Sequence, residues 1–235
     1  MDAEVALDTV AASSPGFVAP DDRVRWGIGD AVSGLLLSLL LSLLVSSVAL
    51  GVVGEDDFDD LPLWGTALLQ VPLWIALFGV PLAATALKGR RSLRCDFGFA
   101  MRWTDVPVGL ALGLGLQLVL GIILQVLYPL FGLDVDRVGD SAEALAGDAT
   151  TGVGVALVIL IAAVGAPLFE ELFYRGLFLR AVQRRFGGVV AVVLPALVLF
   201  GVAMGVVTLR VGRLGPAVWA HVAFNLTALV SLLSR

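Results

Sequence analysis

Two adjacent glutamates lie inside a long apolar stretch of the chain. Glu170 and Glu171 follow a run of apolar and small residues that begins at Gly152, and Arg175 comes one helical turn later. An ionisable side chain in the middle of a bilayer costs roughly 2.5–3.5 kcal/mol on insertion scales. We therefore expect all three side chains to face the interior of a helix bundle and to form a functional site. A structural Glu171–Arg175 pair at i, i+4 is the alternative, but it leaves Glu170 unexplained.

A second group of polar residues lies near the end of the chain. His221 is the only histidine, and Asn225 follows four residues later, so one face of a helix presents both side chains. A lone histidine in an apolar helix is commonly a packing residue. The asparagine one turn away and the glutamates upstream favour a functional role instead.

The composition is that of an integral membrane protein. Of the 235 residues, 59% are hydrophobic and only 15% are charged, whereas soluble domains carry about 25% charged residues. The net charge of −5 resides mainly in the N-terminal tail and two loops, so nucleic-acid binding is not indicated. The single cysteine, Cys95, excludes a disulfide within the chain.

Six apolar runs approach the length that a helical span needs, which predicts an all-α, polytopic bundle with about six spans. The runs cover 31–53, 64–87, 106–130, 152–172, 189–209 and 214–233. We expect a disordered acidic cytoplasmic tail over 1–27, three transmembrane helices over 28–131 and a catalytic-type membrane core over 150–235. Short basic loops stay in the cytoplasm, so we predict a multi-pass plasma-membrane protein with a cytoplasmic N-terminus.

The two polar groups together carry a family resemblance. The segments "EELFYRGLF" and "HVAFN" resemble the CPBP family of intramembrane metalloproteases, which includes the CAAX prenyl proteases and the bacterial Abi-type proteins. Glu170, Glu171 and Arg175 match the family's EExxxR motif. His221 and Asn225 match its HxxxN motif. The similarity covers roughly residues 150–230.

The resemblance implies that a water molecule hydrolyses peptide bonds in a cavity below the membrane surface. Glu170 would be the general base, and Glu171 and Arg175 would orient it. His221 and Asn225 would stabilise the oxyanion or act as ligands. A divalent metal such as zinc is the implied cofactor, with Glu170 and His221 as its ligands. The implied partners are the lipid bilayer and a peptide or membrane-protein substrate.

The chain departs from the family pattern in one motif. The family carries FxxxH between the other two motifs, but the only nearby register places Met204 four residues after Phe200. A thioether cannot act as a general base and is a poor zinc ligand. The chain is therefore expected to hydrolyse peptides very poorly or not at all.

A missing span between residues 193 and 194 is the simplest account of this departure. With one helix between Arg185 and Arg210, the arginines before His221 would lie on the outer face, against the positive-inside rule. At 1.5 Å rise per residue, the glutamates and His221 would then lie on the order of 10–20 Å apart.

Two other functions are open. A catalytically inactive homologue could act as a membrane scaffold or an immunity-type interaction protein. The absence of the FxxxH histidine favours this alternative. A proton-coupled carrier would use the buried acids Glu170 and Glu171, but it leaves the His221–Asn225 pairing unexplained.

Overall fold

The computed structural model describes residues 17–18, 23–53, 63–130, 151–193 and 199–233, which form helices and no strand. This confirms the all-α class predicted from the sequence. The helices are α2 (Ile28–Val53), α3 (Leu63–Lys88), α4 (Leu93–Phe97), α5 (Asp105–Leu130), α7 (Gly152–Val158), η3 (Ile159–Gly165), α8 (Ala166–Glu170), η4 (Glu171–Phe178), α9 (Leu179–Phe186), α10 (Gly188–Val193), α11 (Leu199–Val211) and α12 (Gly215–Leu233).

Four of the predicted spans are found as helices that are long and apolar enough to cross a membrane. They cover Ile28–Val52, Leu68–Lys88, Asp105–Leu130 and Gly152–Phe186, and the last of these joins α7, η3, α8, η4 and α9. Large apolar side chains such as Leu40, Leu43 and Leu118 point outward, as lipid-facing residues do. The chain is a multi-pass membrane protein.

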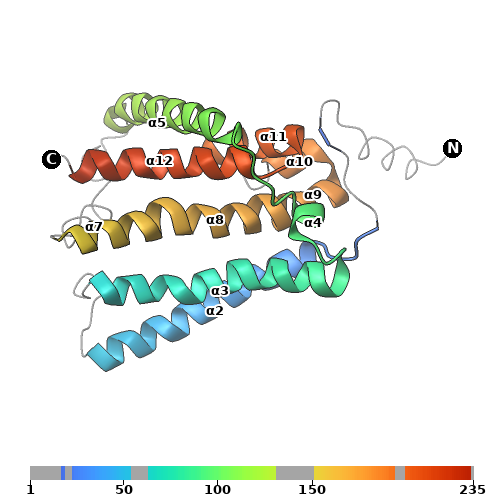
Figure 1. Cartoon of the computed structure of the whole chain (residues 1–235), viewed down its shortest axis with the longest axis horizontal. Coiled ribbons are helices and arrows are strands. Elements are labelled where there is room, and N and C mark those ends of the chain that lie inside the picture. The colour runs from blue at the N-terminus through green and yellow to red at the C-terminus, as the bar shows by residue number, and fades with distance from the viewer. Residues whose placement is uncertain (1–16, 19–22, 54–62, 131–150, 194–198, 234–235) are drawn as a thin grey trace.

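In the fifth apolar run the structure describes two short helices, and residues 194–198 between them lie outside the described part of the chain. α10 has six residues and α11 has thirteen, and neither reaches the roughly 17 residues of a minimal span. Both lie beside α9, at the end of the bundle where α12 begins (Figure 1). The Arg180 guanidinium donates to Gly212 O at 2.9 Å, and Leu214 N donates to Gly98 O at 2.8 Å. The chain therefore enters and leaves this hairpin at one end.

This hairpin corrects the expectation that Arg210 and Arg213 lie opposite the other basic residues. Arg213 pairs with Asp105 at the start of α5 (Nε–Oδ2 3.2 Å), and Lys88 at the end of α3 pairs with Asp30 at the start of α2 (2.7 Å). The basic residues of both halves thus gather at one end of the bundle without any further span.

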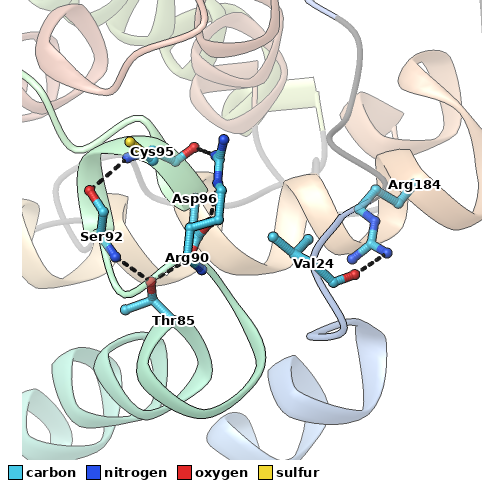
Figure 2. Close-up of polar contacts among 7 residues, drawn as sticks. All are labelled: Val24, Thr85, Arg90, Ser92, Cys95, Asp96 and Arg184. Carbon is cyan, nitrogen blue, oxygen red and sulfur yellow. Dashed lines mark hydrogen bonds and ion pairs between the residues drawn. The ribbon is translucent and has the colours of Figure 1, made fainter.

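A polar network fixes the turn from α3 to α4 at this basic end. Asp96 is 3% exposed and accepts hydrogen bonds from the backbone N–H (2.9 Å) and Nε (2.8 Å) of Arg90, and from the Thr85 hydroxyl. Ser92 N in turn donates to Thr85 Oγ1 at 2.8 Å (Figure 2). The buried carboxylate is thereby paired, as burial of a charge requires.

The predicted disordered tail differs in its last residues. Val24 and Trp26 are 2% and 3% exposed and pack into the core with Phe97 and Leu177. Residues 1–16 and 19–22 of the predicted tail, and the acidic loop at 131–150, lie outside the described residues.

The close approach of α5 to α12 depends on glycine. A Cβ at Gly109 would come within 2.8 Å of Ala220 N, and one at Gly113 within 2.7 Å of Ala223 Cβ. Such GxxxG spacing lets two helix backbones approach closely. The contact sets α12, and with it the His221 motif, against the rest of the bundle.

Candidate active site

The helix that carries the glutamates is distorted around Pro167. Ala166 N donates to Ile161 O, one residue beyond the α-helical acceptor, and the following residue is a proline without an N–H. Ala162 O thus loses both donors that an α- or π-helix would supply. Asn225 Nδ2 of α12 donates to this carbonyl at 2.8 Å, which ties α12 to the helix about two turns before Glu170.

Glu171 is anchored in the interior. It is fully buried, and its Oε1 lies 2.8 Å from Arg175 Nη1 and 2.9 Å from His221 Nδ1. A carboxylate oxygen accepts, so the Nδ1–H of His221 is the donor in this contact. The other carboxylate oxygen, Oε2, is buried with no partner in the described residues. Buried acceptors of this kind are commonly satisfied by water.

Glu170 faces a different direction, because consecutive residues of a helix point about 100° apart. Its side chain is 32% exposed, and Oε2 lies 3.9 Å from Nε2 of His221. The His221 ring therefore stands between the two glutamates, with one nitrogen toward each. A cavity of about 450 Å³ opens here and is lined by Leu120, Glu170, Tyr174, Arg175, Leu179, Phe200, Gly201, Gly205, His221 and Phe224.

α11 closes the other side of the cavity with Phe200. Its ring centroid lies 4.9 Å from that of His221 and 5.0 Å from that of Phe224, and Arg175 Cζ lies 5.7 Å from it. Met204, one turn later, is fully buried against Ala217 and Ala220 and does not line the cavity. The residue in the position of the missing histidine thus packs between helices.

The predicted separation of the two motifs is wrong. Glu171 contacts His221 at 2.9 Å, Glu170 Oε2 lies 3.9 Å from its ring, and Arg175 joins the group through Glu171. The sequence argument had placed the glutamates and His221 some 10–20 Å apart. The error came from counting 189–209 as a full span. Because α10 and α11 return to the basic end, α12 starts there and runs antiparallel to α8 (Figure 1).

The motif search missed some residues that line the cavity, and two predicted site residues, Glu171 and Asn225, do not line it. Tyr174 and Phe200 line the cavity, and Tyr174 could have been noticed as a polar side chain one turn after Glu170. Asn225 does not line the cavity, because its amide is engaged with Ala162 O.

The donor set fits a tightly bound catalytic zinc poorly. In the described residues, no cluster of three or more His, Cys, Asp or Glu side chains is placed to hold a metal ion. Glu170 and His221 Nε2 supply two donors, and catalytic zinc sites use three protein ligands. Glu171 is already committed to Arg175 and His221.

A comparison with protein families finds one match in this part of the chain. Residues 152–200 match the type II CAAX prenyl endopeptidase Rce1-like family, a segment that contains the EExxxR motif and ends before HxxxN. No curated protein and no solved structure matches. The resemblance inferred from Glu170, Glu171 and Arg175 is thereby confirmed: over residues 152–200 this chain matches the Rce1-like family, a family of proteases.

Proposed function

We propose that this chain is an intramembrane endopeptidase in which Glu170 activates the attacking water. The observation that carries the proposal is the gap of 3.9 Å between Glu170 Oε2 and His221 Nε2 on the wall of the cavity. A water in this gap can donate one hydrogen to the carboxylate and the other to the unprotonated imidazole nitrogen.

The steps follow from the chemistry of these groups. Glu170 takes a proton from the water while the water oxygen attacks the peptide carbonyl carbon. The oxyanion that forms can be stabilised by the Arg175 guanidinium or the Tyr174 hydroxyl, which line the same cavity. When the C–N bond breaks, the proton on Glu170 passes to the leaving amine.

Glu171, Arg175 and Asn225 position the reacting groups. Glu171 fixes the tautomer and the ring orientation of His221 through Nδ1. Asn225 was predicted as part of an oxyanion pair. In this proposal it instead positions the helix that carries Glu170, by donating a hydrogen bond to Ala162 O. The divalent metal stays a prediction from the resemblance, and with two donors available no step is assigned to it.

In this proposal the site lies below the membrane surface. Glu170 is ten positions before Arg180, so at 1.5 Å per residue it lies about 15 Å from the basic end. A cytoplasmic basic end, as the positive-inside rule predicts, would place the N-terminus inside the cell. The apolar cavity wall, formed by Leu120, Leu179, Phe200 and Phe224, would then receive a peptide from the bilayer or its cytoplasmic surface.

The experiment uses the full chain in liposomes with a peptide that ends in a prenylated CAAX sequence. We expect cleavage by the native chain and a loss of roughly 10²–10⁴-fold in rate for Glu170→Gln, since that is the typical size of a general-base contribution. Gly115→Ala is a matched control, because a Cβ there meets nothing within 4 Å. Cleavage that persists in Glu170→Gln would refute the role of the base.

A catalytically inactive scaffold is the second candidate, and the two-donor site is the observation that favours it. The same liposomes distinguish it. A scaffold would bind the peptide without cleaving it, and Glu170→Gln would leave that binding unchanged.

A further inference from the structure

A second pocket lies at the basic end of the bundle, between the segment that enters α2 and the end of α9. It encloses about 390 Å³ and is lined by Arg25, Trp26, Gly27, Ile28, Ala181, Arg184, Arg185 and Phe186. None of these residues lines the cavity that contains Glu170. The motif residues therefore do not account for this pocket.

The pocket concentrates positive charge. Three of its lining residues are arginines, and among the described residues no Asp or Glu lines it. The carboxylate in the first turn of α2, Asp30, is occupied by Lys88 Nζ (2.7 Å) and by the backbone N–H of Gly27 (2.9 Å). Arg25 and Arg185 are exposed, and neither is in an ion pair with a described carboxylate.

One arginine is held rigidly in the pocket wall. Arg184 donates through Nη2 to Val24 O at 2.9 Å (Figure 2) and through Nη1 to Trp26 O, and its Cζ lies 5.2 Å from the Trp26 ring. Arg184 Nε and Trp26 Nε1 are both buried with no hydrogen-bond partner in the described residues. Two buried N–H donors without acceptors are unusual in a folded protein.

The N-terminus of α2 adds to this field. Gly27 and Ile28 belong to the pocket wall. The Gly27 amide donates to Asp30, whereas the amide of Ile28, the first residue of α2, is a first-turn amide without an intrahelical acceptor at the positive end of the helix dipole. Arginine forks and helix N-termini both suit the oxygens of a phosphate group. The pocket thus fits a phosphate group rather than an apolar ligand.

The position of the pocket indicates where that phosphate comes from. The pocket joins the ends of two membrane-length helices, Ile28–Val52 and Gly152–Phe186. Phe186 on its rim is 51% exposed. Basic pockets between spanning helices on the cytoplasmic side bind anionic lipid headgroups. We propose that Arg25, Arg184 and Arg185 bind the phosphate of an anionic phospholipid.

The test measures lipid binding to the full chain in neutral detergent. Phosphatidylglycerol, phosphatidylcholine and inorganic phosphate are added separately, and bound lipid is counted by native mass spectrometry. The double variant Arg25→Gln/Arg185→Gln removes the two exposed arginines and leaves Arg184 in place. Arg210→Gln is the matched control, because Arg210 is an exposed arginine outside the pocket. Unchanged size-exclusion profiles establish that the variants are folded.

We expect the native chain and Arg210→Gln to retain phosphatidylglycerol in preference to phosphatidylcholine. The double variant should bind it roughly 25-fold more weakly, about fivefold for each arginine, which is the factor that corresponds to ~1 kcal/mol per basic residue near an anionic surface. Equal binding by the double variant would overturn the proposal. Inorganic phosphate that displaces the lipid at micromolar concentration would also overturn it, since the ligand would then be soluble. None of these outcomes depends on peptidase activity.

Discussion

Replacing Glu171 by glutamine tests whether the interior of the site is an ion pair. Glu171 is fully buried, and the paired Arg175 side chain is 13% exposed. Removing one partner of a buried pair costs about 3–5 kcal/mol, because the other charge stays buried without compensation. For a chain of this size, each kcal/mol lowers Tm by roughly 2–4 °C. We expect Glu171→Gln to melt roughly 6–20 °C below the native chain.

Glu170→Gln is the matched control for this measurement. Glu170 is the neighbouring residue and the same type, but its side chain is 32% exposed, and its Oε2 lies 3.9 Å from His221 Nε2. We expect its Tm to change by only a few degrees, since the change removes no hydrogen bond seen in the described residues. Tryptophan fluorescence in detergent follows both melts.

The contrast between the two variants decides the argument. Both should lose peptidase activity, Glu170→Gln through the base and Glu171→Gln through the orientation of His221. Only Glu171→Gln should lose stability. The double variant Glu171→Leu/Arg175→Met should recover most of the lost stability, because well-packed apolar residues can replace a buried pair. Equal melting of Glu170→Gln and Glu171→Gln would refute the burial of the pair.

Three further predictions follow from contacts outside the ion pair. Asn225→Ala should lower the free energy of unfolding by about 1–3 kcal/mol, because the Ala162 carbonyl loses its donor, and thermal melting measures this. The same variant should lower kcat in steady-state kinetics. Gly109→Leu should destabilise the chain by at least ~1–3 kcal/mol through overpacking against Trp219 and Ala220, whereas Gly121→Leu, whose Cβ meets nothing within 4 Å, should not. Cys95, which is exposed, should react with an impermeant thiol reagent in inside-out vesicles but not in intact cells.

Most residues of the candidate site could be picked out from the sequence because charge inside an apolar run is costly wherever it lies. Glu170, Glu171 and Arg175 stand out on that ground alone. His221 stands out only together with Asn225 and the upstream glutamates, and the structure brings the four side chains together. The different environments of the two glutamates also follow from helix geometry, since neighbours differ by about 100°. Which of the two would be buried depends on where Arg175 and His221 lie.

The path of the chain between α9 and α12 could not be predicted in the same way. Hydropathy counts apolar residues, and the run 189–209 has enough of them for a span. What turns the chain back is tertiary: Arg180 holds Gly212 O, Leu214 N donates to Gly98 O, and Arg213 pairs with Asp105. These partners come from three places: α9, the loop that follows α4, and the start of α5. No window of the sequence contains them together.

The contact of Asn225 with Ala162 in η3 could be predicted only in part. Pro167 is five residues after Ala162, so a π-turn there leaves one carbonyl without a donor. The sequence shows that a donor is needed, and the structure shows that Asn225 supplies it. HxxxN spacing then has a physical reason: it places on one helix face the imidazole that meets the glutamates and the amide that holds the turn before them.

The absence of the FxxxH histidine does not separate the glutamates from His221, because α10 and α11 return the chain to the basic end. A lost span would have separated the motifs, and restoring it would have been necessary for any shared chemistry. In this bundle the glutamates and His221 are already in contact, and Met204 packs against Ala217 and Ala220 outside the cavity. The substitution therefore reduces the number of donors available to a metal without moving the base or its imidazole partner. Competence then depends on whether Glu170 and His221 alone can activate water, which the Glu170→Gln liposome assay measures directly.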